Sequence, residues 1–269
     1  MASHAPASAL PGRDPSAAPT LRDAAKVVGW GLLFWAAVQF ASIPFARSAV
    51  ALVAVQALLA EWCAGRLGIP WSDPLAPLPT RQQVAGRVAR GAAAGGAAAV
   101  VVLALVILVL RRSQPAEGSL APTALAISLV VTLLKAARDE LLLRGIVLRA
   151  TRGLLPWWVS LAATGACAAA AQFGLQGVLS LGLAAEAMRA VALGALWLRD
   201  RGAWMAVAAN AMWTWTLAAG GVVDLRFLGG GDASVAGLAV TTVAAVIAVA
   251  WASRALPAPT GRSEARRGV

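Results

Sequence analysis

The sequence predicts an all-α fold, a polytopic membrane helix bundle of about eight transmembrane helices. Three observations predict it. Of the 269 residues, 59% are hydrophobic and only 13% are charged, whereas soluble domains are about half apolar and a quarter charged. The mean hydropathy is +0.73. Finally, the apolar residues gather in stretches close to the roughly 20 residues that a membrane-spanning helix needs. These features exclude an ordinary soluble domain.

Eight apolar stretches are expected to cross the membrane. They cover residues 25–45, 48–66, 88–110, 120–150, 156–177, 178–198, 202–222 and 235–254. The fourth is over-long because it contains a charged stretch, so we expect its cytoplasmic end to leave the bilayer. Pro44 is expected to kink a helix, and the Gly-rich "GAAAGG" at Gly91 to Gly96 to allow close helix contact. Because no strand precedes it, this Gly-rich run does not indicate a phosphate-binding loop.

The two ends of the chain differ in composition from this domain. Residues 1–23 are rich in Ala, Pro and Ser without a long apolar run, and residues 256–269 are similarly polar. Such segments bury too little apolar surface to fold alone, so we expect disordered tails and no signal peptide. The transmembrane domain is then expected to cover residues 24–255.

Basic residues predict the orientation. With eight spans both termini share one side, which carries 15 basic residues against four on the other. Lys135, Arg138, Arg144 and Arg189 are left out of this count because they are expected within the membrane. Lys and Arg collect in cytoplasmic loops, so both termini are predicted to be cytoplasmic. This distribution also explains the net charge of +11 without nucleic acid as a partner. High Ala, Gly and Arg with only two Lys is typical of a GC-rich bacterial genome, which predicts a multi-pass protein of the bacterial cytoplasmic (inner) membrane.

Metal and cofactor sites are not expected. Cys63 and Cys167 lie in apolar stretches without CxxC spacing, which argues against a disulfide or a Cys-based zinc site. The single histidine, His4, lies in the N-terminal tail, so a zinc site built on imidazoles is not expected within the membrane either.

The stretch "KAARDELLLRGIVLRATRG" places charges inside the fourth predicted span. Each ionisable group at the bilayer centre costs roughly 2.5–3.5 kcal/mol, so such groups usually face a protein interior or a watery cavity. Glu140 and Arg144 are four residues apart and are expected to pair, and Lys135 and Asp139 have the same spacing. Asp139 and Glu140 point about 100° apart on a helix and are not expected to share one role. Two interpretations stay open: salt bridges that stabilise a helix end, or a carboxylate that activates water.

A second charged pair, Glu186 and Arg189, lies within the sixth predicted span. It is expected to be a buried ion pair that fixes helix packing, or a substrate contact in the same cavity.

Two segments resemble motifs of one family. "DELLLRGIVLRA" resembles the first motif, Glu-Glu-x-x-x-Arg, of the CPBP (Abi) family, the CAAX-protease and bacteriocin-processing intramembrane endopeptidases. "LGALWLRDRGAWMAVAANAMWTW" is similar to the Gly-rich helix, turn and His-Ala-x-x-Asn helix of the third motif region. The resemblance covers about residues 121–215, the motif-bearing core, and eight spans agree with the family's architecture.

The resemblance implies a glutamate-based hydrolase that acts on membrane or prenylated proteins. By position in the first motif, the water-activating residue is Asp139, the supporting carboxylate is Glu140, and their arginine is Arg144. In the third motif the histidine position falls on Asn210 and the asparagine position on Thr214.

The second-motif histidine position is ambiguous. Counting from Trp158 without gaps places it on Gln172, whereas anchoring on Phe173 places it on Gly177; the ungapped count is preferred. Counted from the predicted helix ends, Asp139, Gln172 and Asn210 all lie about 13–22 Å into the membrane, so a polar cluster is expected at the bundle centre.

Departures from these motifs leave three functions open. No histidine occupies a motif position, and Asn210 or Gln172 can donate a hydrogen bond but cannot shuttle a proton. One hypothesis is a catalytically degenerate protein that binds a transmembrane or lipid-modified protein client. Another is a divergent endopeptidase with Asp139 or Glu140 as base. The third is a small transporter, for which the expected inverted repeats are not visible. Membrane lipids are expected partners of each.

Overall fold

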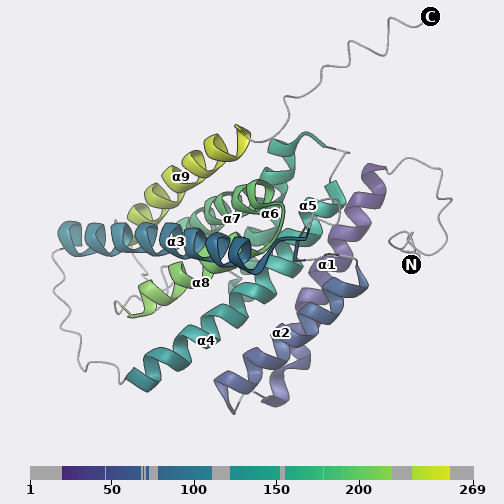
Figure 1. Ribbon diagram of the computed structural model, residues 1–269, viewed down its shortest axis with the longest axis horizontal. Helices are drawn as coiled ribbons and strands as arrows, with labels where there is room; N and C mark the ends of the chain where they lie inside the picture. The colour runs from purple at the N-terminus through teal and green to yellow at the C-terminus, as the bar shows by residue number, and fades with distance from the viewer. Residues whose placement is uncertain are drawn as a thin grey trace, which may run out of the picture.

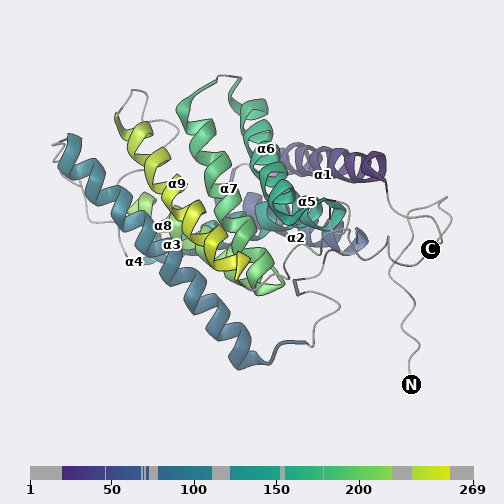
Figure 2. The same ribbon diagram turned by 90° about the horizontal axis from the view of Figure 1, so that it is seen from above.

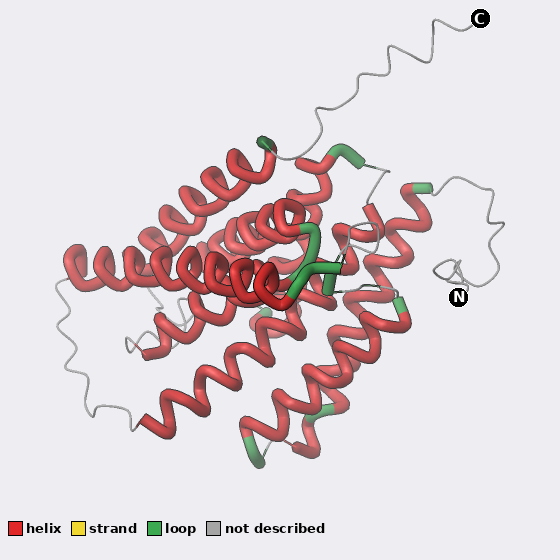
Figure 3. Tube along the Cα trace, viewed as in Figure 1, coloured by secondary structure: helices red, strands yellow, loops and turns green. Residues whose placement is uncertain are grey.

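The computed structural model describes residues 20–45, 47–67, 69, 71–72, 78–110, 122–151, 155–177, 179–219 and 232–254. Within these ranges the chain is all-helical, and the pairing of Ser72 with Gly202 is an isolated bridge outside any strand (Figure 3). The expected tails lie outside the described residues, apart from the start of the first helix at Leu21.

Each of the eight predicted stretches forms a helix or a continuous run of helical segments. They are α1 (Leu21–Ala41), α2 (Ala49–Arg66), α3 (Arg81–Leu110), the run α4 (Pro122–Asp139), η2 (Glu140–Gly145) and α5 (Ile146–Thr151), then α6 (Trp157–Gln176), α7 (Leu181–Asp200), α8 (Trp204–Ala219) and α9 (Asp232–Ser253). Among the described residues, four helical segments are long and apolar enough to cross a membrane: Val28–Phe45, Ala49–Arg66, Arg81–Leu105 and Leu181–Asp200. The protein thus has the composition and helices of a membrane protein.

Two local predictions need correction. Helix α3 begins at Arg81, seven residues before the predicted start of the third span. Thr80 and Gln83 exchange side chain–backbone hydrogen bonds of 2.9 and 3.3 Å, a capping box that fixes this earlier start. Pro44 lies in a short 3₁₀ turn, η1 (Ile43–Phe45), at the end of the segment Val28–Phe45, so it follows the last α-helical turn of α1 instead of kinking the helix.

The helices form a bundle around the run from α4 to α5. Helix α4 packs between α2 and α8, α5 packs on α1, and α7 lies between α6 and α9 (Figures 1 and 2). Leu141, Leu142 and Ile146 of this run are buried in the main apolar core. The charged stretch therefore lies at the centre of the bundle.

Helix α3 packs closely on α8, as the Gly-rich run predicts. A Cβ atom at Gly91 would lie 2.2 Å from the carbonyl oxygen of Met205, and one at Gly95 would lie 2.0 Å from that of Ala209. Only glycine permits this approach of two backbones. The contact fixes the part of α8 that carries Asn210.

Candidate functional site

The charged stretch contains a π-helical segment, η2, in place of a regular α-helical turn. All six of its residues are buried. A π-helical turn holds one residue more than an α-helical turn, and such turns are rare and frequent at functional sites. A Cβ atom at Gly145 would lie 2.9 Å from Cη2 of Trp197, so glycine lets the segment pack against α7. The sequence spacing alone gave no indication of this segment.

Glu140 and Arg144 form the expected ion pair. Nη1 of Arg144 donates to Oε1 of Glu140 at 2.6 Å, and the two side chains are 1% and 0% exposed. Nδ2 of Asn210 donates to the same oxygen at 2.9 Å. The π segment and α8 are therefore joined through one carboxylate oxygen.

Arg189 and Glu186 of α7 extend this network. Nη2 of Arg189 lies 2.6 Å from Oε2 of Glu186, and its Nη1 donates a short hydrogen bond to Oδ1 of Asn210. Oε1 of Glu186 lies 3.8 Å from Nη2 of Arg144. The predicted α7 ion pair is thus formed, and it belongs to the same site as the motif residues.

These contacts close on themselves, and we call the set the polar ring. It consists of Glu140, Arg144, Glu186, Arg189 and Asn210, from η2, α7 and α8. Two carboxylates balance two guanidinium groups, and the single amide both donates and accepts. Paired and hydrogen-bonded charges are the form in which ionic groups are tolerated away from water.

Asp139 belongs to a different network, although it adjoins Glu140. Its Oδ1 accepts from Nε of Arg138 at 2.7 Å and from the indole nitrogen of Trp35 at 3.4 Å. Its side chain is 25% exposed, whereas that of Glu140 is fully buried. The expected divergence of the two carboxylates is present.

Neutral side chains from α1 and α2 complete this second network, which we call the amide cluster. Arg138 donates to Oε1 of Gln56, and Nε2 of Gln56 donates to Oε1 of Gln39 at 3.1 Å and to Oγ of Ser42 at 2.8 Å. The amide cluster consists of Trp35, Gln39, Ser42, Gln56, Arg138 and Asp139. Asp139 was the one member with a predicted role, and isolated glutamines within apolar helices were a visible signal for the others.

The remaining motif positions are Gln172, Gly177 and Thr214. Gln172 is buried on α6, which packs against the π segment. Gly177 ends that helix with a left-handed backbone, at φ 69°, so it lies beyond the last helical turn. Thr214 is half-buried one turn along α8 from Asn210, and the contacts that define the ring do not include it.

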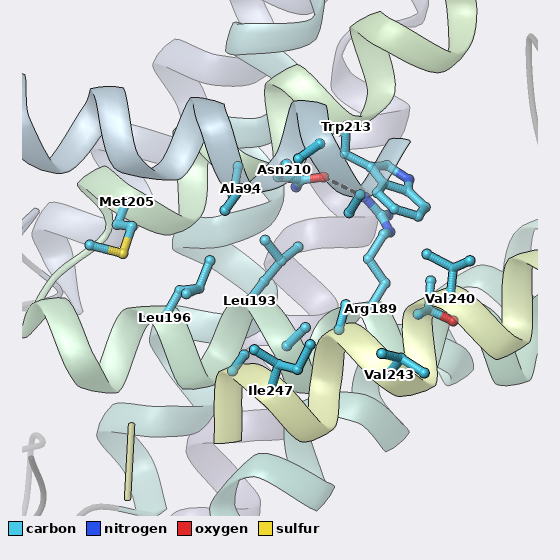
Figure 4. A pocket seen from close by; sticks show the side chains of 18 of the residues that line it. Ala94, Arg189, Leu193, Leu196, Met205, Asn210, Trp213, Val240, Val243 and Ile247 are labelled. Atoms are coloured by element: carbon cyan, nitrogen blue, oxygen red, sulfur yellow. Dashed lines mark hydrogen bonds between the residues drawn. The ribbon is translucent and has the colours of Figure 1, made fainter. Parts of the chain in front are cut away.

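A cavity of about 580 Å³ opens beside the ring, between α3, α7, α8 and α9. Arg189 and Asn210 lie at one end of it, beside Trp213, and apolar side chains such as Leu193 and Ile247 form its walls (Figure 4). Its volume is within the range of small-molecule sites, about 300–1,000 Å³. The ring thus has one face on a ligand-sized, largely apolar space.

Within the described residues, no three His, Cys, Asp or Glu side chains gather in a way that could hold a metal ion. Comparisons of the chain with family models, curated proteins and solved structures find no match.

Proposed function

We propose that the chain is an eight-span protein of CPBP type in the bacterial cytoplasmic membrane, with both termini cytoplasmic. In this proposal its centre binds a membrane-embedded or lipid-modified protein client and does not cut it. The observation that supports this proposal most is that the contacts of the polar ring form a closed circuit. Asn210, at the position of a motif histidine, already accepts from Arg189 and donates to Glu140.

Asp139 supports the same proposal. The position that would activate water holds a carboxylate bonded to Arg138 and Trp35. A general base must lie within hydrogen-bond reach of the proton it removes, and an amide cannot replace a histidine in moving that proton. The ligand-sized cavity beside the ring accounts for binding without either group.

One observation favours the alternative, a divergent endopeptidase. Oε2 of Glu140 is buried and accepts no hydrogen bond from the described residues. A carboxylate oxygen in this state could accept a proton from water, with Asn210 beside it as a hydrogen-bond donor. In this alternative Glu140, rather than Asp139, is the base.

Quantitative proteomics separates the two functions. A deletion strain is complemented with wild type, Asp139→Asn, Glu140→Gln or the control Glu61→Gln, whose carboxylate bonds Trp71 away from the ring. Binding without cutting predicts membrane proteins whose abundance falls on deletion and recovers with all four alleles, without new C-terminal peptides. Each allele's level in the membrane is measured alongside.

A cleaved product that appears with wild type and Glu61→Gln but not with Glu140→Gln would overturn the binding proposal and establish the endopeptidase. Dependence on Asp139 as well would assign both carboxylates to the reaction.

A further inference from the structure

The cavity between α3, α7, α8 and α9 has two chemically different ends. Helices α7 and α9 run in the same direction along it, because Arg189 and Val240 line one end while Trp251 lines the other and contacts Arg199. At the first end Arg189 is held by Glu186 and Asn210. At that end, the charge of Arg189 is therefore neutralised by Glu186.

The Trp251 end is cationic. Arg90 of α3 lines the cavity, and its neighbour Gly91 packs on Met205, which lies at the end away from Arg189 (Figure 4). The guanidinium of Arg199 lies 4.9 Å from the ring centroid of Trp251. The neighbouring carboxylate, Asp200, lies 3.0 Å from Nε of Arg87 and is already paired. Among the described residues lining the cavity, Arg90 and Arg189 are the charged ones, and none is acidic. This end thus favours an anion.

The walls between the two ends suit a hydrocarbon chain. From Trp251 to Val240 the cavity follows eleven residues of α9, or about 16 Å. One leaflet of a bilayer has about the same hydrocarbon depth, roughly 15 Å. The length of the apolar wall therefore matches one acyl chain.

The cavity is also open to the side. Val101 of α3 and Val243 and Ile247 of α9 line it and are largely exposed. In Figure 1 the C-terminal part of α9, which carries Trp251, extends away from α3. A chain can thus enter from the membrane between these two helices.

We propose that this cavity binds one acyl chain of an anionic phospholipid, with the phosphate beside Arg90 and Arg199 and the chain along α9 toward the polar ring. In the proposed orientation the phosphate lies in the cytoplasmic leaflet. The leaflet rests on the proposed orientation, and the lipid occupies the cavity that the proposed function gives to a client, so the two would compete for it. Retention of the lipid is measured on the purified chain without a client.

Native mass spectrometry of the purified full chain tests it. The chain is reconstituted in nanodiscs of equal phosphatidylglycerol and phosphatidylcholine with identical acyl chains, and the retained lipid is counted. Wild type should retain one phosphatidylglycerol per chain. Arg90→Gln should lower the ratio of retained phosphatidylglycerol to phosphatidylcholine about fivefold, the contribution of one arginine beside an anionic headgroup.

Filling the cavity tests the acyl chain separately. Ala244→Trp, on the cavity wall, should abolish retention of both lipids, and Ala97→Trp on the facing helix should repeat the result if the first variant does not fold. The matched controls are Ala250→Trp, exposed on α9 outside the cavity, and Arg81→Gln at the start of α3. Thermal unfolding of every variant is measured in parallel.

Equal retention of the two lipids by wild type would overturn the proposal. So would retention that survives in folded Arg90→Gln and Ala244→Trp variants, because the lipid would then be bound to the outer surface only.

Discussion

Asp139 and Glu140 are neighbours in the sequence, yet they belong to two networks of different composition. The polar ring balances two carboxylates with two guanidinium groups and joins η2, α7 and α8. The amide cluster contains one carboxylate and one guanidinium, surrounded by neutral side chains of α1 and α2. The ring contains three contacts between opposite charges and one amide, whereas most contacts of the cluster involve the amides of Gln39 and Gln56.

This difference separates the tasks of the two carboxylates. A step of one residue turns the side chain by about 100°, which is enough to give each carboxylate its own set of helices. Glu140 is tied to the helices that line the cavity, and Asp139 is tied to the first two helices. Changes in the two networks should therefore have different consequences.

The largest effect is expected from Arg144→Met in the ring. This change leaves Glu140 charged, fully buried and paired only with Asn210, so the free energy of unfolding should fall by about 3–5 kcal/mol. Denaturant titration in detergent micelles, followed by tryptophan fluorescence, measures it. Replacing both partners, as Glu140→Leu with Arg144→Met, should recover most of the loss. A loss of under about 1 kcal/mol for the single change would show that the ring does not bury a charge.

Gly95→Ala should come next, because α3 supports the ring through α8. The added methyl would lie 2.0 Å from the carbonyl oxygen of Ala209, and such overpacking costs about 1–3 kcal/mol. The matched change is Gly96→Ala, whose Cβ would meet nothing closer than Oγ1 of Thr216 at 4.0 Å. Equal midpoints of thermal unfolding for the two variants would contradict the close contact.

In the amide cluster, Gln56→Leu should cost about 1–3 kcal/mol, because Arg138 loses its short bond to Gln56, and Gln39 and Ser42 each lose a donor. Nη1 of Arg138 keeps only its 3.5 Å bond to Oε1 of Gln39. It should leave client and lipid binding unchanged, because no residue of the amide cluster lines the cavity. Gln82→Leu, exposed on α3, serves as its control. Loss of phosphatidylglycerol retention in folded Gln56→Leu would show that the two networks act as one.

Thr214→Val should have the smallest effect, within about 0.5 kcal/mol, because Thr214 is only half-buried and stands outside the ring contacts. Asn210→Leu, one turn away, should cost several times as much, since Arg189 and Glu140 each lose a bond. Thermal unfolding of the two variants makes the comparison. Similar losses of stability for the two variants would show that the site includes Thr214, one helical turn beyond Asn210.

The spacing of residues predicted the local features. Eight apolar stretches became helices, residues four apart formed the Glu140–Arg144 pair, and the Gly-rich run contacted another helix. These features were predictable because each depends only on the geometry of a few turns of one helix or on the size of a residue. The all-α fold followed for the same reason.

Features that depend on tertiary contact were not predictable. Spacing did not identify Arg138 or the distant Trp35 as donors to the carboxylate of Asp139. The α7 ion pair joined the motif residues because α7 meets α8 at Asn210 and meets the π segment at Arg144. Helix packing determines which side chains become hydrogen-bond or ion-pair partners, and the spacing of residues in the sequence does not predict helix packing.

The π segment has a consequence for the phase of the fourth helix. Its additional residue lets α4 keep Arg138 and Asp139 toward α1 and α2 while α5, beyond it, keeps its own contact with α1. Deleting one residue between Glu140 and Gly145 would turn everything after it by about 100°. The register of the whole helix thus depends on the length of six residues, and length there is a stricter requirement than the identity of any one apolar side chain.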